Sequence, residues 1–454
     1  MSFRKVLFWL HLLAGLVAGV VILIMSVTGA AVAFEKEIIA WAERDVRRVT
    51  PPPTDAKPLP LDELLARVRE MKPGERPSGI TLEADPNAAL LVSFGRTNVL
   101  YVNPYSGEIR EPSGDGVRSF MQTMLTWHRY LGVGEKHRTL GKAITGACNA
   151  AFLFLAASGL YLWWPRQWTK ATLRCVTLMN FKLRGKARDW NWHNAVGLWT
   201  APVLLVLTAT ALPISYQWAS NLIYKITGSP APAPGATAGA GGPAVEIPTP
   251  PEGAKPLGLA AMIAVAQKEV PNWKQISQRS AGPGGRGQRP VAAGFQPGGG
   301  TSGETKNGEN SRRSERADAN PDGKMPSSTS GRMPDATGER GSPQPITLTI
   351  IERGQWPLFA NTQLTLDPFT GAVLRKESFG DANLGRQVRS WTRFLHTGEA
   401  LGGAGKAVAG LTSALAALLV WTGFALAWRR FFPRRSQETA EPKTISAAQA
   451  AAKE

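Results

Sequence analysis

The second half of this chain repeats part of the first. Residues 100–166 match residues 364–430 with a constant offset of 264 and no gap. The matched features include a turn, NPYSG at 103–107 and DPFTG at 367–371, and a later apolar stretch that ends in tryptophan. A self-match of this length indicates a duplicated structural unit, so the two halves are expected to fold alike.

Four apolar runs are long enough to cross a bilayer, which takes about 20 residues in a helix. They cover residues 6–34, 143–164, 195–218 and 407–428. The first run is longer than the roughly 7–15 apolar residues of a cleaved signal peptide, so we expect it to remain as an anchor. The chain is therefore expected to be a multi-pass membrane protein in contact with lipid.

Basic residues gather beside these runs and predict the orientation. Arg4 and Lys5 precede the first run, Arg429 and Arg430 follow the fourth, and the segment between the second and third is strongly basic. By the positive-inside rule these three places are cytoplasmic. We therefore expect a bacterial inner-membrane protein with both termini in the cytoplasm and both long segments in the periplasm. Because this clustering accounts for part of the net charge of +18, a nucleic-acid partner is not needed.

Each long outer segment has the pattern of a small module of one helix and an antiparallel sheet. In the first, a helical pattern at 60–71 precedes strand-like pieces at 79–82, 89–94 and 99–102. The second repeats this order, with a helical pattern at 257–270 and strand-like pieces at 273–278, 346–351, 362–366 and 372–375. Residues 279–345, rich in Gly, Pro, Ser, Asn and Arg, are predicted to be a disordered insert, and residues 228–258 a linker.

The predicted fold class is an α-helical integral membrane protein with four transmembrane helices in two parallel duplicated halves and two small periplasmic α+β modules. The cytoplasmic parts are a basic loop at 167–192 and a tail at 431–454. The remaining segments, in chain order, are a first spanning helix at 1–34, a first module at 35–126, a second spanning helix with its entry helix at 127–166, a third at 193–218, a second module at 219–390, and a fourth spanning helix with its entry helix at 391–430.

Two familiar kinds of site are excluded by the sequence. Cys148 and Cys175 are the only cysteines, they have no plausible pairing, and there is no C-x-x-C-H for covalent haem attachment. Neither a Walker loop nor a G-x-G-x-x-G that opens a helix after a strand is present, so no nucleotide site is visible.

The chain has five histidines, and four of them form two matched pairs. His11 and His193 enter the first and third spanning helices from the cytoplasmic side, and each is followed four residues later by Gly-Leu. His128 and His396 precede the second and fourth helices on the outer side. They differ from the repeat alignment by one helical turn, which leaves both imidazoles facing the bundle interior. His137 has no counterpart and is interpreted as a solvated residue.

A single histidine at membrane depth is more often a hydrogen-bonding residue than a ligand, but two matched pairs favour metal binding. Two histidines from facing helices make the axial ligand set of a haem. A structural zinc site needs four ligands at one point, whereas these pairs lie on opposite sides of the membrane. We therefore predict two b-type haems with iron bound by His11 and His193, and by His128 and His396.

Basic residues recur beside the outer histidines. Arg129 and Arg393 are related by the repeat and are candidates to bind haem propionates, with contact to lipid headgroups an equally good interpretation. Lys142 and Lys406 also recur, and snorkelling to the headgroups is the expected role.

The motifs resemble a known family. The W-L-H-x-x-A-G-L sequence at the start, L-H-T-G-E before the last run and S-G-L-x-L-W-W-P-R at the end of the second, with the duplicated modules between them, resemble the PepSY-associated transmembrane family. That resemblance implies PepSY-like modules, a role in iron uptake shared with ferric siderophore reductases, and haem ligation by the four paired histidines. The insert at 279–345 departs from the family pattern.

The expected function is electron transfer across the membrane to a periplasmic acceptor, most simply a ferric siderophore that releases Fe(II). The electron donor stays open between quinol, a cytoplasmic reductase and a flavoprotein. One alternative is a non-enzymatic anchored protein whose modules bind a peptidase or another envelope partner. A second is a transporter component for iron or siderophore, although the helix centres lack the charged residues typical of such sites.

Overall fold

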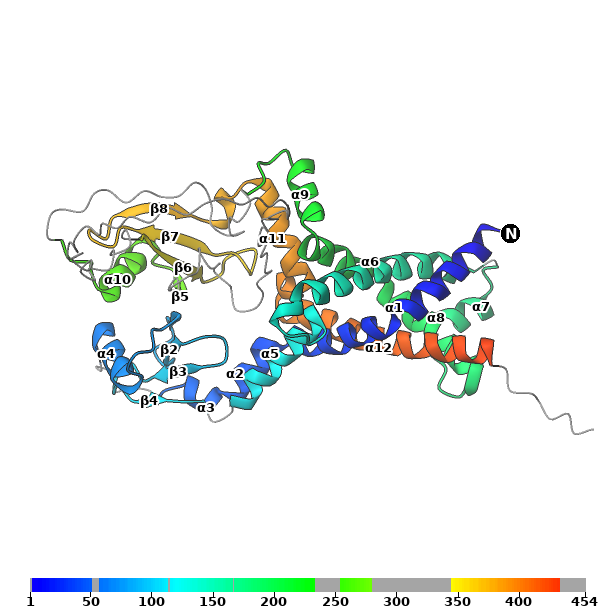
Figure 1. Cartoon of the computed structure of the whole chain (residues 1–454), viewed down its shortest axis with the longest axis horizontal. Helices are drawn as coiled ribbons and strands as arrows, with labels where there is room; N and C mark the ends of the chain where they lie inside the picture. The colour runs from blue at the N-terminus through cyan, green and yellow to red at the C-terminus, as the bar shows by residue number, and fades with distance from the viewer. Residues whose placement is uncertain are drawn as a thin grey trace, which may run out of the picture.

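The computed structural model describes residues 2–50, 57–112, 115–165, 167–232, 254–279 and 344–432. Nearly all of the predicted insert at 279–345, most of the predicted linker at 228–258 and nearly all of the tail at 431–454 lie outside these residues. The described chain has two parts, a helical bundle that includes the N-terminus and a part built on β-strands (Figure 1).

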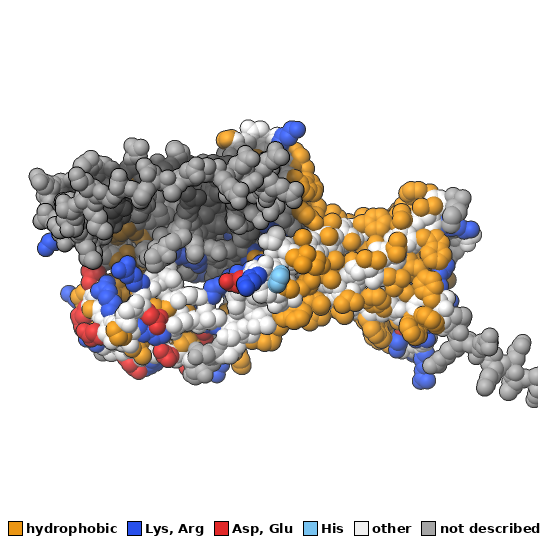
Figure 2. Space-filling model, in the orientation of Figure 1, with side chains coloured by type: hydrophobic (Ala, Val, Ile, Leu, Met, Phe, Trp, Pro, Cys, Tyr) orange, Lys and Arg blue, Asp and Glu red, His pale blue; other side chains and the backbone are white. Residues whose placement is uncertain are grey.

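Four helices form the bundle, and each is long and apolar enough to cross a membrane. The helices α1 (Phe3–Ala33) and α8 (Gly185–Ser215) each contact both α6 (Arg138–Trp163) and α12 (Gly402–Phe431). The helices α1 and α8 therefore face each other diagonally across the bundle. Hydrophobic side chains cover the bundle surface, and basic side chains gather at the end away from the strands (Figure 2). This chain is a membrane protein.

The segment predicted as a basic loop at 167–192 is largely helical. It contains α7 (Lys170–Thr177) and the first two turns of α8, which begins at Gly185 and not near residue 193. The polar start of α8 is stable inside the protein because Asp189, fully buried, is neutralised by arginine partners. Apolar run length therefore underestimated this helix.

Two amphipathic helices connect the strands to the bundle. The helix α5 (Asp115–Tyr130) packs on α1, and α11 (Leu384–His396) packs on α8. The boundaries predicted at 127 and 391 were too late, because both helices begin well before the apolar runs. Short elements complete this end of the bundle: α2 (Glu35–Ala42), α3 (Arg44–Arg47), α9 (Gln217–Ile226), and the 3₁₀ turns η1 (Glu135–His137), η2 (Phe379–Asp381) and η3 (Glu399–Leu401).

The strands of both halves form one antiparallel sheet of eight strands, in the order β4-β3-β2-β1-β5-β6-β7-β8. Strand β1 of the first half pairs with β5 of the second, with Thr81 opposite Ser277. The two modules predicted as separate units are thus joined through their first strands. The strands are β1 (Gly79–Glu83), β2 (Leu90–Ser93), β3 (Val99–Val102), β4 (Ile109–Arg110), β5 (Trp273–Arg279), β6 (Ile346–Glu352), β7 (Thr362–Leu366) and β8 (Val373–Glu377).

One continuous core lies on one face of this sheet. The helices α4 (Leu61–Met71) and α10 (Leu259–Glu269) contact each other and bury the apolar residues of the first and second halves, respectively. Leu61, Leu82 and Leu259 pack against both clusters. Burial of apolar surface therefore adds to strand pairing in joining the two halves.

The repeated turn has the same geometry in both halves. The side-chain Oδ1 of Asn103 accepts a hydrogen bond from the backbone N–H of Tyr105, and Oδ1 of Asp367 accepts one from Phe369, each at 2.9 Å. Gly107 and Gly371 both have a φ of 72°, a conformation that favours glycine because it has no Cβ. The order of helix, four strands, amphipathic helix and spanning helix is also the same in both halves.

Candidate functional site

His128 and His396 lie together at the end of the bundle next to the sheet. His128 is in the last turn of α5, and His396 is the last residue of α11. Their ring centroids are 6.3 Å apart with an interplanar angle of 43°. We call these two residues the sheet-side pair.

Both histidines of the sheet-side pair use Nδ1 for a backbone hydrogen bond. Nδ1 of His128 lies 2.9 Å from the carbonyl oxygen of Met25, and Nδ1 of His396 lies 2.9 Å from that of Leu207. A carbonyl oxygen can only accept, so each Nδ1 must carry the proton and donate it. In the neutral imidazole the other nitrogen, Nε2, then has a free lone pair that can bind a metal.

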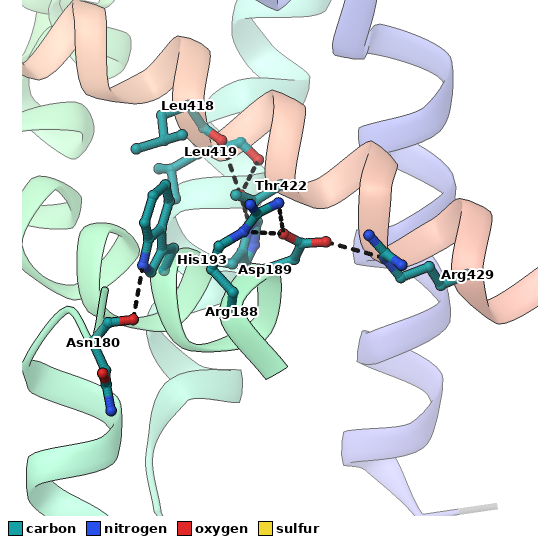
Figure 3. Close-up of polar contacts among 9 residues, drawn as sticks. Asn180, Arg188, Asp189, His193, Leu418, Leu419, Thr422 and Arg429 are labelled. Carbon is teal, nitrogen blue, oxygen red and sulfur yellow. Dashed lines mark hydrogen bonds and ion pairs between the residues drawn. The ribbon is translucent and has the colours of Figure 1, made fainter. Parts of the chain in front are cut away.

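His11 and His193 form a second pair at the other end of the bundle, the far-side pair. Nδ1 of His11 lies 2.8 Å from Oγ of Ser158, and Nδ1 of His193 lies 3.0 Å from Oγ1 of Thr422. The Thr422 hydroxyl donates its own proton to the carbonyl of Leu418 at 2.9 Å (Figure 3). The Ser158 hydroxyl donates to the carbonyl of Leu155 at 3.3 Å. Both hydroxyls therefore accept from the histidines, which again leaves the lone pair on Nε2, the nitrogen that could bind a metal.

The hydrogen-bond partners of the histidines are related by the internal repeats. Ser158 and Thr422 differ by the offset of 264 that relates α6 and α12. Met25 and Leu207 differ by 182, which is also the offset between His11 and His193. Such acceptors hold the orientation of an imidazole, and in a metal site they also raise its basicity as a ligand. Sequence analysis had not identified them, although the repeat alignment of Ser158 with Thr422 was a usable signal.

Glycines lie against three of the four imidazoles. A Cβ added at Gly159 would lie 3.4 Å from Cε1 of His11, and one added at Gly423 would lie 3.6 Å from Cε1 of His193, which are ordinary contact distances. At Gly29 the added Cβ would approach Cε1 of His128 to 3.0 Å, closer than packed side chains normally come. Glycine at position 29 therefore leaves room for the His128 ring.

Each pair lines a cavity. The far-side cavity has a volume of about 930 Å³, within the roughly 300–1,000 Å³ of ligand pockets. The cavity at the sheet-side pair is narrower, about 150 Å³, so a large planar ligand there would have to displace neighbouring side chains. Three residues, Phe152, Leu204 and Ala416, line both cavities and are the partition between them.

The donor set suits a metal that needs two axial ligands. A histidine nitrogen binds a transition metal at about 2.0–2.1 Å, and the ring centre lies roughly 1.2 Å beyond it, so two imidazoles on opposite sides of one metal have centres about 6.4–6.6 Å apart. The sheet-side ring centroids, 6.3 Å apart, are close to this spacing. No group of three or more His, Cys, Asp or Glu side chains suited to a metal occurs in the part of the chain that the structure describes, so the described residues do not form a four-ligand zinc site.

The basic residues predicted beside the outer histidines have different positions. Arg129 lines the sheet-side cavity, whereas Arg393 is not among the described residues that line it. The Arg393 guanidinium lies over the ring of Phe394, 5.1 Å from its centroid. At the far side, Arg4 and Lys186 line the mouth of the cavity. Each precedes its histidine by seven residues, or two helical turns, and so shares its face of the helix.

A buried ion cluster beside His193 was not found from the sequence. Asp189, one turn before His193 in α8, pairs with Arg188 at 2.8 Å and with Arg429 of α12 at 3.1 Å (Figure 3). The pair with Arg429 ties the two helices that hold His193 and its partner Thr422. The single acid in a basic segment was visible in the sequence, but its burial was not.

The comparison with protein families agrees with the architecture. No curated protein matches the chain. The family model described as PepSY-associated TM region matches residues 8–430, which include the whole sheet and all four membrane-spanning helices except the first residues of α1 and the last residue of α12. This chain therefore belongs to the PepSY-associated transmembrane family.

Proposed function

We propose that this protein carries two b-type haems and transfers electrons across the bacterial inner membrane. The observation that carries the proposal is the state of the four histidines: all donate from Nδ1 and present Nε2, in two pairs, with sheet-side rings close to the axial spacing. His11 and Met25, whose carbonyl accepts the hydrogen bond from His128, are 14 residues apart on α1. At 1.5 Å per residue this separation is about 21 Å along the helix. Two redox sites at different depths of a roughly 30 Å hydrocarbon core suit transmembrane electron transfer.

The chain's residues have separable roles in this proposal. His11 and His193 would hold one haem, with Arg4 and Lys186 placed to neutralise its propionates. His128 and His396 would hold the other, with Arg129 at its edge. A bound haem supplies one-electron chemistry at a potential set by axial ligands, hydrogen bonds and burial. The shared wall of Phe152, Leu204 and Ala416 is apolar and lies between the two sites.

The direction of transfer follows from the proposed topology. The basic far end would face the cytoplasm, and the sheet would be periplasmic, with duplicated halves contributing one histidine to each pair. A donor such as a quinol or a cytoplasmic reductase would give one electron at the far side for each electron that leaves at the sheet side. The acceptor would be a ferric siderophore, whose Fe(III) gains that electron and leaves as Fe(II), because hard oxygen ligands bind Fe(II) less well.

The test is the absorbance spectrum of the detergent-purified protein, oxidised and reduced with dithionite, with haem quantified per chain. We expect a low-spin bis-histidine spectrum and two haems per chain, and oxidation of the reduced protein by a ferric siderophore in a one-electron stoichiometry. A colourless protein from a haem-replete host would refute the proposal. It would favour the alternative in which the sheet binds an envelope partner and the helices only anchor it.

A further inference from the structure

Two lysines related by the internal repeat have different environments. Lys406, at the start of α12, is buried, and its Nζ lies 2.6 Å from Oε1 of Glu37. Its counterpart Lys142, at the start of α6, is half-buried, and its ammonium has no hydrogen bond or ion pair within the described ranges. Both had been expected to snorkel to lipid headgroups, but both line the sheet-side cavity.

The difference has a simple cause in the sequence. Glu37 lies in α2, just after α1, and the offset of 182 that relates α1 to α8 places Ala219 at the equivalent position. The second half thus offers no acid where Lys142 would need one. On the same side of the cavity as α12, Lys36 neutralises the Glu399 carboxylate, with its Nζ 2.8 Å from Oε2.

The remaining charges around Lys142 are mostly positive. Arg129 lines the same cavity. Arg389 of α11 is not among the described residues that line it, and its Nε donates a hydrogen bond to Oγ of Ser220 at 3.2 Å. The two acids that line the cavity are each next to a basic side chain, Glu399 beside Lys36 and Glu35 beside Arg96 at 3.7 Å. A half-buried cation that faces like charges in a cavity is costly unless an anion joins it.

We propose that Lys142, with Arg129, forms a carboxylate-binding site on one side of the sheet-side cavity. This inference rests on the proposed function only for the source of the carboxylate. The carboxylate is either a propionate of the haem at His128 and His396 or an acidic group of the ferric chelate that receives the electron. In both cases the α6 side of the cavity binds the anion, and the α12 side, with Lys406 held by Glu37, does not.

The test compares Lys142→Gln and Lys142→Arg with a matched control, Lys136→Gln, which removes a charge from an exposed residue of η1 six positions earlier. In the first arm, the haem-free full-length proteins also carry His11→Ala, so that only the sheet-side pair can bind haem. They are titrated with haem or with haem dimethyl ester, which lacks free carboxylates. In the second arm, haem-free full-length protein is titrated calorimetrically with ferric citrate or with ferrioxamine, a hydroxamate chelate without carboxylates.

In one arm or the other, Lys142→Gln is expected to weaken binding of the carboxylate-bearing probe about tenfold or more, the size of one lost charge-assisted hydrogen bond. The ester and the hydroxamate should bind all variants equally, and Lys142→Arg should retain binding. An effect in the first arm identifies a haem propionate, and an effect in the second identifies an acidic chelate. If Lys142→Gln behaves like Lys136→Gln in both arms, the inference is wrong. A protein that takes up no haem refutes the proposed function, and the citrate arm alone then decides the inference.

Discussion

Ser158 and Thr422 occupy equivalent positions in α6 and α12 and accept hydrogen bonds from the Nδ1 atoms of His11 and His193, at 2.8 and 3.0 Å. Replacing Thr422 with Val keeps the shape of the side chain but leaves a buried N–H without an acceptor. We expect haem affinity at the far side to fall about 10–100-fold, as for other residues that orient a metal ligand.

The matched control for this substitution is Thr210→Val. Thr210 is half-buried on α8, and its hydroxyl donates only to carbonyls of its own helix, those of Val206 at 2.6 Å and Leu207 at 3.1 Å. Haem titration of both variants measures the difference. Equal affinities for Thr422→Val and Thr210→Val would show that the hydroxyl does not orient His193.

Removing one histidine from each pair separates the two sites. Under the proposed function, we expect His193→Ala and His396→Ala each to reduce the haem content from the proposed two per chain to one, because the two pairs lie in different cavities. His137→Ala should keep both haems, since His137 is exposed in η1. Haem quantification per chain is the measurement, and loss of both haems in either single variant would indicate one shared site.

A buried ion pair joins the first half of the sheet to the helix that carries His128. Arg118 of α5 contacts both carboxylate oxygens of Glu43, which is 2% exposed and also accepts a hydrogen bond from Tyr101 Oη at 2.7 Å. Glu43→Gln removes the negative charge and leaves the guanidinium uncompensated. We expect the free energy of unfolding to fall by about 3 kcal/mol.

Glu83→Gln is the control for Glu43→Gln, because its pair with Arg47, at 3.5 Å, is more exposed. Its expected effect is below about 1 kcal/mol. Hydrogen exchange of the β3 amides measures both variants, and comparable losses of protection would contradict the prediction. Arg386, ten residues before His396 as Arg118 is before His128, forms an analogous pair with Glu377.

The repeated turn differs in its pH dependence between the halves. The Asp367 carboxylate accepts hydrogen bonds from the backbone N–H of Phe369 and, with a smaller effect, from the hydroxyl of Thr370. These bonds hold the pKa of Asp367 below its ordinary value. A carboxyl with a lowered folded-state pKa stabilises the fold above its unfolded pKa, and the effect is lost as the pH falls through the folded value. Asp367→Asn, the counterpart of Asn103 in the first half, should remove this dependence below about pH 4. Thermal unfolding from pH 5 to pH 3 measures it, and parallel curves for the two proteins would contradict it.

The pairing of β1 with β5 predicts a specific crosslink. Thr81 and Ser277 lie opposite each other, so cysteines at both positions should form a disulfide on mild oxidation. Cysteines at Thr81 and Thr349 are the control, because Thr349 lies one strand further away, opposite Ser277. A crosslink that forms equally in both variants would contradict the joined sheet.

Much of the architecture could be read from the sequence. The four spanning helices, seven of the eight strands within two residues of their ends, the repeated turn and the two sets of histidines follow from apolar run length, alternation and internal repetition, which are local properties. The third expected span began too late because polar residues form the start of α8. There the buried pairs of Asp189 offset the polar character of the segment.

The tertiary structure decided what depends on contacts between distant segments. The sequence by itself determined that each half has a helix-and-sheet module, but only the fold placed β1 beside β5 and merged the two modules into one sheet. The sequence also determined that His128 and His396 belong together. It did not show that the carbonyls of Met25 and Leu207 set the tautomers of these histidines, since those acceptors are backbone atoms and have no sequence signature. Lys142 and Lys406 are identical in the repeat, and only the position of Glu37 makes Lys406 an ion-pair partner and leaves Lys142 without an acidic partner among the described residues.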